Sequence, residues 1–135
     1  MPIANALSAY DDILTEMDNF GYKPLLLTDA KVGDDVFFEL SFSGLETTDN
    51  RSNPGVMPRL TLAMAVNYTH DFVAADKRLM QAVLEVYPFL ISQALGQIDD
   101  ERTSWTPDPD IDRLPARIGM NLTLTLRNGL VSYKD

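Results

Sequence analysis

The fold is decided by the stretch Leu60-Thr-Leu-Ala-Met-Ala-Val-Asn-Tyr68, in which every second side chain is a large apolar one. A second stretch, Ile118-Gly-Met-Asn-Leu-Thr-Leu-Thr-Leu126, repeats this pattern nearer the C-terminus. Successive side chains of a β-strand point to opposite faces, so each stretch predicts a strand with one face against a hydrophobic core. The other face carries small or polar side chains: Thr61, Ala63, Ala65, Asn67, Asn121, Thr123 and Thr125. Such a face is suited to being covered by another protein surface.

Two amphipathic helices are predicted on either side of the first alternating stretch. Apolar residues recur at intervals of three and four over residues 3–20, and again from about residue 74 to residue 95. Gly21 and Gly96 are natural helix ends. Pro88 lies inside the second segment and removes one backbone hydrogen bond, so we expect a kink there or two helices end to end.

The remaining segments predict one further strand, one edge segment and two long loops. Residues 35–43 alternate as a strand, with Phe37 as the one large apolar side chain on the polar side. Residues 22–28 fit an edge strand or an extended connector, because Pro24 disfavours a central position. Residues 45–57 and 97–117 lack periodicity and are polar, which predicts loops.

These elements predict a single α+β domain covering residues 1–135. We expect a mostly antiparallel sheet of about four strands, with the N-terminal helix and the kinked helix packed on one face. Residues 127–130 are expected to turn back and to leave residues 131–135 as a short tail.

The composition excludes several classes of function. The chain has no cysteine, so it can form neither a disulfide nor a thiolate metal site. Twenty acidic and eleven basic residues give a net charge of -9, which disfavours binding to nucleic acid through phosphate neutralisation. The N-terminus lacks the basic flank and apolar run of a leader, and no apolar run is long enough to span a membrane. We therefore expect a soluble protein made in the cytoplasm.

No catalytic residue and no cofactor are predicted. The one histidine, His70, stands beside Asp71 at a strand-to-helix junction, where a local hydrogen bond is favoured over a role as a base. No serine lies in a nucleophile motif, and no glycine-rich phosphate loop is present. The chain is therefore not predicted to be an enzyme.

A metal site is not predicted either. Asp108, Asp110 and Asp112 alternate as in a calcium-binding loop, but Arg113 occupies the position that requires glycine and Gly119 the position that requires glutamate. A solvated acidic loop is the better interpretation. Trp105, the only tryptophan, either folds back onto the edge of the core or anchors a partner protein.

The order of elements between residues 59 and 127 resembles that of a known family. A strand with the sequence Leu-Thr-Leu-Ala-Met-Ala-Val-Asn-Tyr precedes a helix that contains the step Tyr87-Pro88, and Met-Asn-Leu-Thr-Leu-Thr-Leu follows as the last strand. This layout resembles the tail terminator proteins of long-tailed bacteriophages, which also open with a helix. The likeness covers about the whole chain, although the two loops are longer than in the compact family pattern.

The resemblance implies a structural protein of the virion. The family forms a ring, expected to be a hexamer, at the head-proximal end of the tail tube. The ring ends polymerisation of the tube protein and presents a surface to the head connector or stopper protein, and DNA only passes through its lumen. In this chain the predicted subunit or partner interface consists of Phe37, Thr61, Ala63, Ala65, Asn67, Trp105, Thr123 and Thr125.

Two alternatives stay open. The long loops are compatible with a neighbouring role in the same apparatus, as a head-side stopper, a neck protein or a tail completion protein. The chain is also compatible with a small module that binds a partner or a ligand in a pocket between helix and sheet, with Phe37 and Trp105 as candidate lining residues.

Overall fold

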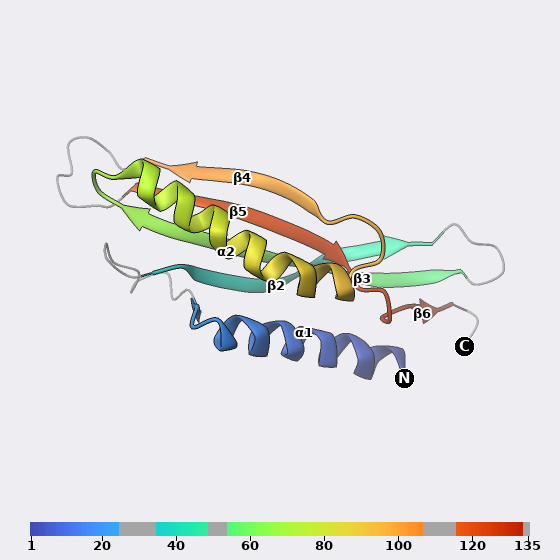
Figure 1. Cartoon of the computed structure of the whole chain (residues 1–135). Coiled ribbons are helices and arrows are strands. Elements are labelled where there is room, and N and C mark those ends of the chain that lie inside the picture. Colours follow the sequence, from blue (N-terminus) through green and yellow to red (C-terminus); the bar gives the residue numbers. More distant parts are fainter. Residues whose placement is uncertain (25–34, 49–53, 107–115, 134–135) are drawn as a thin grey trace.

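The computed structural model describes residues 1–24, 35–48, 54–106 and 116–133. Within these ranges the chain forms two helices and six strands, shown in Figure 1. In chain order they are α1 (Pro2–Asn19), β1 (Lys23–Pro24), β2 (Phe37–Thr47), β3 (Gly55–Tyr68), α2 (Phe72–Gln93), β4 (Asp99–Trp105), β5 (Ala116–Thr125) and β6 (Val131–Ser132). The α+β class is therefore confirmed.

The strands form one mixed sheet with the order β1-β2-β3-β5-β4, and β6 pairs with β3. The β1–β2 pair is parallel and the other pairs are antiparallel. Our expectation of about four strands was therefore too low. The two strands that were not expected are β4, which lies in a predicted loop, and the two-residue β6, which is too short to give an alternating pattern.

The register separates the two faces of the sheet. Leu62 of β3 lies between Leu40 of β2 and Leu122 of β5, and all three side chains are buried under the helices. Both helices pack on this face: α2 contacts β3 and β5, and Tyr10 of α1 donates a hydrogen bond to the carbonyl oxygen of Leu40. Figure 1 shows the long axis of α2 following the strands. The predicted helix layer on one side of the sheet is thus observed.

The predicted loop over residues 97–117 is wrong for residues 99–105, which form β4. Every residue of this strand is exposed, because β4 is the outer strand of the sheet and neither helix covers it. An edge strand exposed on both faces needs no alternation of apolar residues, and its charges protect the edge from pairing with other chains. Residues 107–115 of the same predicted loop lie outside the described residues.

The predicted loop over residues 45–57 is wrong at both ends, because β2 extends to Thr47 and β3 begins at Gly55. Residues 49–53, in its middle, lie outside the described residues. The predicted tail is wrong at Val131 and Ser132, which pair with β3 as β6, while residues 134–135 are not described. In the predicted edge segment, Lys23 and Pro24 do form an edge strand, and residues 25–28 are not described.

Helix α2 runs without interruption through Pro88, so the expectation of two helices end to end is wrong. Pro88 is exposed, and proline removes only one hydrogen bond from a helix whose opposite side is buried. The buried side consists of Ala75, Leu79, Ala82, Val86 and Leu90. The side chain of Asp71 caps the first turn by accepting a hydrogen bond from the backbone N–H of Ala74 at 2.9 Å.

Candidate protein interaction surfaces

The sheet face opposite the helices brings together half of the predicted interface residues as a shallow polar surface. Thr61, Ala63 and Ala65 of β3 and Thr123 of β5 are all partly exposed there. Thr61 lies directly opposite Thr123, and their hydroxyl oxygens are 2.9 Å apart. We call this surface, with its neighbours Glu39, Asn121 and Glu101, the sheet face.

Three other predicted interface residues are buried within the chain itself. Phe37 is only 3% exposed, because the guanidinium of Arg117 covers its ring at 4.9 Å from the centroid. The Nε of Arg117 in turn donates to Oδ1 of Asn67 at 2.9 Å. Thr125 donates a hydrogen bond of 2.5 Å to Oε2 of Glu46. Phe37, Asn67 and Thr125 therefore support the sheet face from within and leave little surface for a partner.

The last predicted interface residue, Trp105, ends β4 and is 47% exposed. Its position in a strand corrects the prediction that it lies in a loop. The register pairs it with Arg117, so it belongs to the same side of the sheet as Phe37. About half of the side chain is accessible to a partner, and the role of Trp105 as an anchor stays a prediction.

Acidic side chains border the sheet face on both sides. Glu39 on β2 and Glu101 on β4 are exposed at the two ends of the row that contains Ala63 and Asn121. Asp99, at the start of β4, faces the same side beside Thr123. The surface therefore combines small side chains in its centre with carboxylates at its rim, which disfavours contact with phosphate groups.

The sequence prediction missed an exposed apolar stripe along α2. The α2 stripe consists of Val73, Met80, Leu84, Tyr87 and Ile91, all of which are exposed. Met80 and Leu84 line a groove of about 220 Å³ together with Arg102 of β4 and Met120 of β5, so the stripe lies on the β4 side of the helix layer. The sequence does contain a signal for this stripe, because the apolar residues of α2 cover more than one side of the helix. An interpretation that assumes a single apolar face overlooks it.

A second apolar surface lies on the opposite flank of the helix layer, between α1 and the distal ends of β2, β3 and β6. It is a groove of about 450 Å³, which we call the α1 groove. Its lining includes Ile3, Leu7, Tyr10, Phe42, Leu45 and Val131. The sequence pattern placed Ile3, Leu7 and Phe42 toward the core, but each is more than half exposed because the ends of α1 and β2 extend beyond it.

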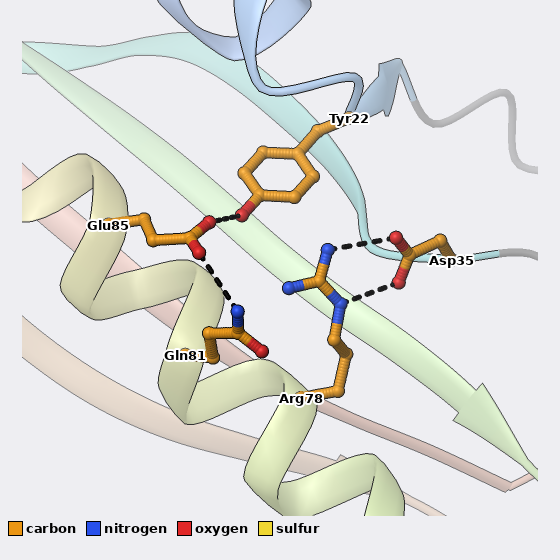
Figure 2. Close-up of polar contacts among 5 residues, drawn as sticks. All are labelled: Tyr22, Asp35, Arg78, Gln81 and Glu85. Atoms are coloured by element: carbon orange, nitrogen blue, oxygen red, sulfur yellow. Dashed lines mark hydrogen bonds and ion pairs between the residues drawn. The ribbon is translucent and has the colours of Figure 1, made fainter.

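A polar network fixes α2 relative to the start of the sheet, as Figure 2 shows. The hydroxyl of Tyr22 donates to Oε2 of Glu85 at 2.5 Å, and Nε2 of Gln81 donates to Oε1 of the same carboxylate at 3.0 Å. Burial, followed by the hydrogen bond to Glu85, raises the pKa of Tyr22 to about 12. The same hydrogen bond is the main reason that the pKa of Glu85 is lowered.

An ion pair continues this network toward β2. Nε and Nη2 of Arg78 donate to the two carboxylate oxygens of Asp35, each at 2.9 Å, and the Arg78 guanidinium lies 5.5 Å from the Tyr22 ring centroid. The hydrogen bonds from Arg78 are the main reason that the pKa of Asp35 is lowered. Because these groups link α2 to the residues just before β1 and β2, they fix the position of the helix and of the α2 stripe on it.

The described residues do not assemble a catalytic or metal-binding constellation. His70 is exposed and makes no hydrogen bond to a described residue, whereas Asp71 is occupied as the α2 cap. In the same ranges of the chain, no three acidic or histidine side chains gather to hold a metal ion. Asp108, Asp110 and Asp112 lie outside the described residues. None of the described helices is long and apolar enough to cross a membrane.

Comparison of the chain with protein-family models and with curated proteins finds no match.

Proposed function

We propose that this chain is a structural subunit of the tail of a long-tailed bacteriophage, where it forms a ring at the head-proximal end of the tail tube. The ring ends tube polymerisation and provides the surface for head-tail joining. The proposal rests on the resemblance in the order of elements and on one structural observation: the subunit exposes apolar surface on both flanks of its helix layer.

Exposed apolar surface of this extent supports a protein that acts by binding other subunits. Soluble monomers rarely expose contiguous apolar patches of more than a few hundred Å², and larger ones mark interaction sites. A subunit inside a ring needs two surfaces for its neighbours and a further surface for the structure that the ring caps. The two apolar flanks and the polar sheet face supply three such surfaces on one small domain.

The test is a mass measurement in solution combined with electron microscopy. We expect closed rings of a defined subunit number, either at high protein concentration or on the ends of tail tubes assembled from the tube protein. The tubes are included because a subunit that needs a template would stay monomeric alone. A protein that remains monomeric at every concentration and does not bind tube ends would refute the proposal.

A binding experiment separates tail termination from a role on the head side. A terminator binds tube ends and shortens tubes when it is added during their polymerisation. A stopper or neck protein binds DNA-filled heads and leaves tube length unchanged. Incubation with each particle, followed by sedimentation, distinguishes these outcomes.

The α1 groove also favours a second candidate, a module that binds a small apolar ligand. Its volume of about 450 Å³ and the exposed Leu7 and Phe42 are compatible with such a ligand. Phe37 and Trp105, the lining residues expected from the sequence, do not line this groove. A ligand that fills the groove should raise the melting temperature of the monomer. Absence of any shift across an apolar ligand panel, together with ring formation, would remove this candidate.

A further inference from the structure

We infer that copies of this chain join head to tail, with the α2 stripe of one copy seated in the α1 groove of the next. This inference rests on the proposed ring function and specifies its subunit contact. It assigns the contact between copies to the two flanks of the helix layer and leaves the sheet face free for a different partner.

The two apolar surfaces are separate and lie on opposite flanks of the molecule. The α1 groove is built from α1, β2, β3 and β6, whereas the stripe is built from α2 alone and adjoins β4 and β5. No residue belongs to both. Two different surfaces that face away from each other define a heterologous contact, in which each copy uses one surface for each neighbour. A two-fold pairing of stripe with stripe would leave the groove open in the dimer.

The stripe and the groove match in chemistry. Met80, Leu84 and Ile91 project from one side of a helical segment that spans roughly 16 Å. On the groove side, Ile3 and Leu7 of α1 stand opposite Phe42 and Leu45 of β2, and none of the groove residues is charged. Apolar side chains on a rigid helix that enter an uncharged groove follow a common mode of protein recognition.

Charges of opposite sign border the two surfaces. Asp11 lies one helical turn after Leu7 on the exposed side of α1. Lys77 lies one turn before Met80 beside the α2 stripe, and it is exposed without an ion-pair partner among the described residues. Insertion of the stripe with its N-terminal end beside Asp11 brings the ammonium group of Lys77 toward this carboxylate. In a chain with a net charge of -9, this complementarity favours the head-to-tail contact over other contacts between copies.

The contact is tested first by directed cross-linking. Because the chain has no cysteine, variants L7C and L84C each carry a single thiol. We mix these two variants at high concentration with tail tubes present and add a short bis-maleimide. The control is a mixture of A4C and A74C, which places thiols at exposed positions of the same helices outside both surfaces. We expect the yield of cross-linked heterodimer from L7C and L84C to exceed the yield from the control by at least tenfold. Equal yields from the two mixtures would overturn the inference.

A second test uses blocked surfaces. Leu7→Asp blocks the groove and Leu84→Asp blocks the stripe, and both positions are more than half exposed, so the fold should survive, as circular dichroism can verify. Each variant alone should stay monomeric. Mixed together they should form a 1:1 dimer that cannot grow, because one intact groove and one intact stripe remain. Ala4→Asp and Ala74→Asp add the same charge elsewhere and should leave ring formation unchanged.

The outcomes separate this inference from the proposed function. If each blocked variant alone still forms rings with the subunit number of the wild type, the stripe-in-groove contact is refuted and the ring function stays intact. Dimers formed by Leu7→Asp alone would indicate a two-fold stripe contact and would also refute it. Failure of the wild-type protein to form rings, even on tube ends, would refute the proposed function itself.

Discussion

At the scale of single residues, Tyr22 links pH to stability. Burial and the Glu85 carboxylate raise its pKa from 10.0 to about 12, so the folded protein keeps the phenol proton to higher pH than the unfolded chain does. The contribution of Tyr22 to the free energy of unfolding is therefore complete below pH 10. It declines between about pH 10 and pH 12, by about 1.4 kcal/mol per pH unit.

Tyr22→Phe removes both the hydrogen bond and the titrating group. We expect it to lower the free energy of unfolding by about 1–2 kcal/mol at pH 8, and we expect this deficit to shrink above pH 10 as the wild type loses its advantage. Urea unfolding of both proteins at several pH values measures the difference. Tyr133→Phe, which changes an exposed side chain, is the control. A deficit that is the same at pH 8 and pH 11 would show that Tyr22 does not titrate as described.

Gly119 is a position at which the sheet leaves no room for a side chain. A Cβ atom there would lie 2.8 Å from the carbonyl oxygen of Met64 and 2.9 Å from Oγ1 of Thr103. We expect Gly119→Ala to lower the free energy of unfolding by about 1–3 kcal/mol, because one of these neighbours is backbone and cannot move alone. Thermal and urea unfolding measure the loss. Adding Thr103→Ala to this variant should restore only part of the lost free energy of unfolding, because the contact with the Met64 carbonyl oxygen remains. A full recovery would mean that the strain comes from Thr103 alone.

At the scale of elements, α2 depends on its N-terminal cap. Asp71 accepts the backbone hydrogen bond of Ala74, and no other acidic residue lies in the first turn. We expect Asp71→Ala to lower the free energy of unfolding by about 1 kcal/mol and Asp71→Asn to change it little, since asparagine can accept the same bond. Urea unfolding compares the three proteins. Equal losses in both variants would mean that the charge matters and the hydrogen bond does not.

Elements with one buried face could be predicted from the sequence, and elements without one could not. The alternation around Leu62 and Leu122 predicted β3 and β5 because burial on one face selects apolar residues at every second position. Strand β4 shows no such pattern, since all of its residues are exposed and its backbone pairs with β5 alone among the described strands. The extension of β2 to Thr47 was missed for a similar reason, because none of its last residues is buried.

The candidate surfaces were predictable to the same extent. Period-two alternation placed Thr61, Ala63 and Thr123 on one face, as the structure does. The burial of Phe37 under Arg117 joins residues that are far apart in sequence, and no local pattern encodes such a contact. The sequence does not separate the α2 stripe from the core. It shows which residues of a helix are apolar, whereas packing against the sheet decides which of them are buried.

At the scale of the whole molecule, the subunit presents its apolar surfaces at its flanks and its acidic surface on the sheet. The buried core and the Tyr22 network hold the helix layer on one side of the sheet, so the flanks and the sheet face point in different directions. In a ring joined through its flanks, every subunit presents the sheet face in the same orientation.

The sheet face is then predicted to bind the partner that the ring caps or joins. Ala63→Arg places a long cation in the centre of this face, where Glu39 can pair with it, so the fold should be retained. We expect rings of normal subunit number that no longer sediment with tail tubes or copurify with the head connector, with at least a tenfold loss of one of these interactions. Ala74→Arg on α2 is the matched control and should keep both. Loss of the rings themselves would mean that the sheet face, and not the helix flanks, joins one copy to the next.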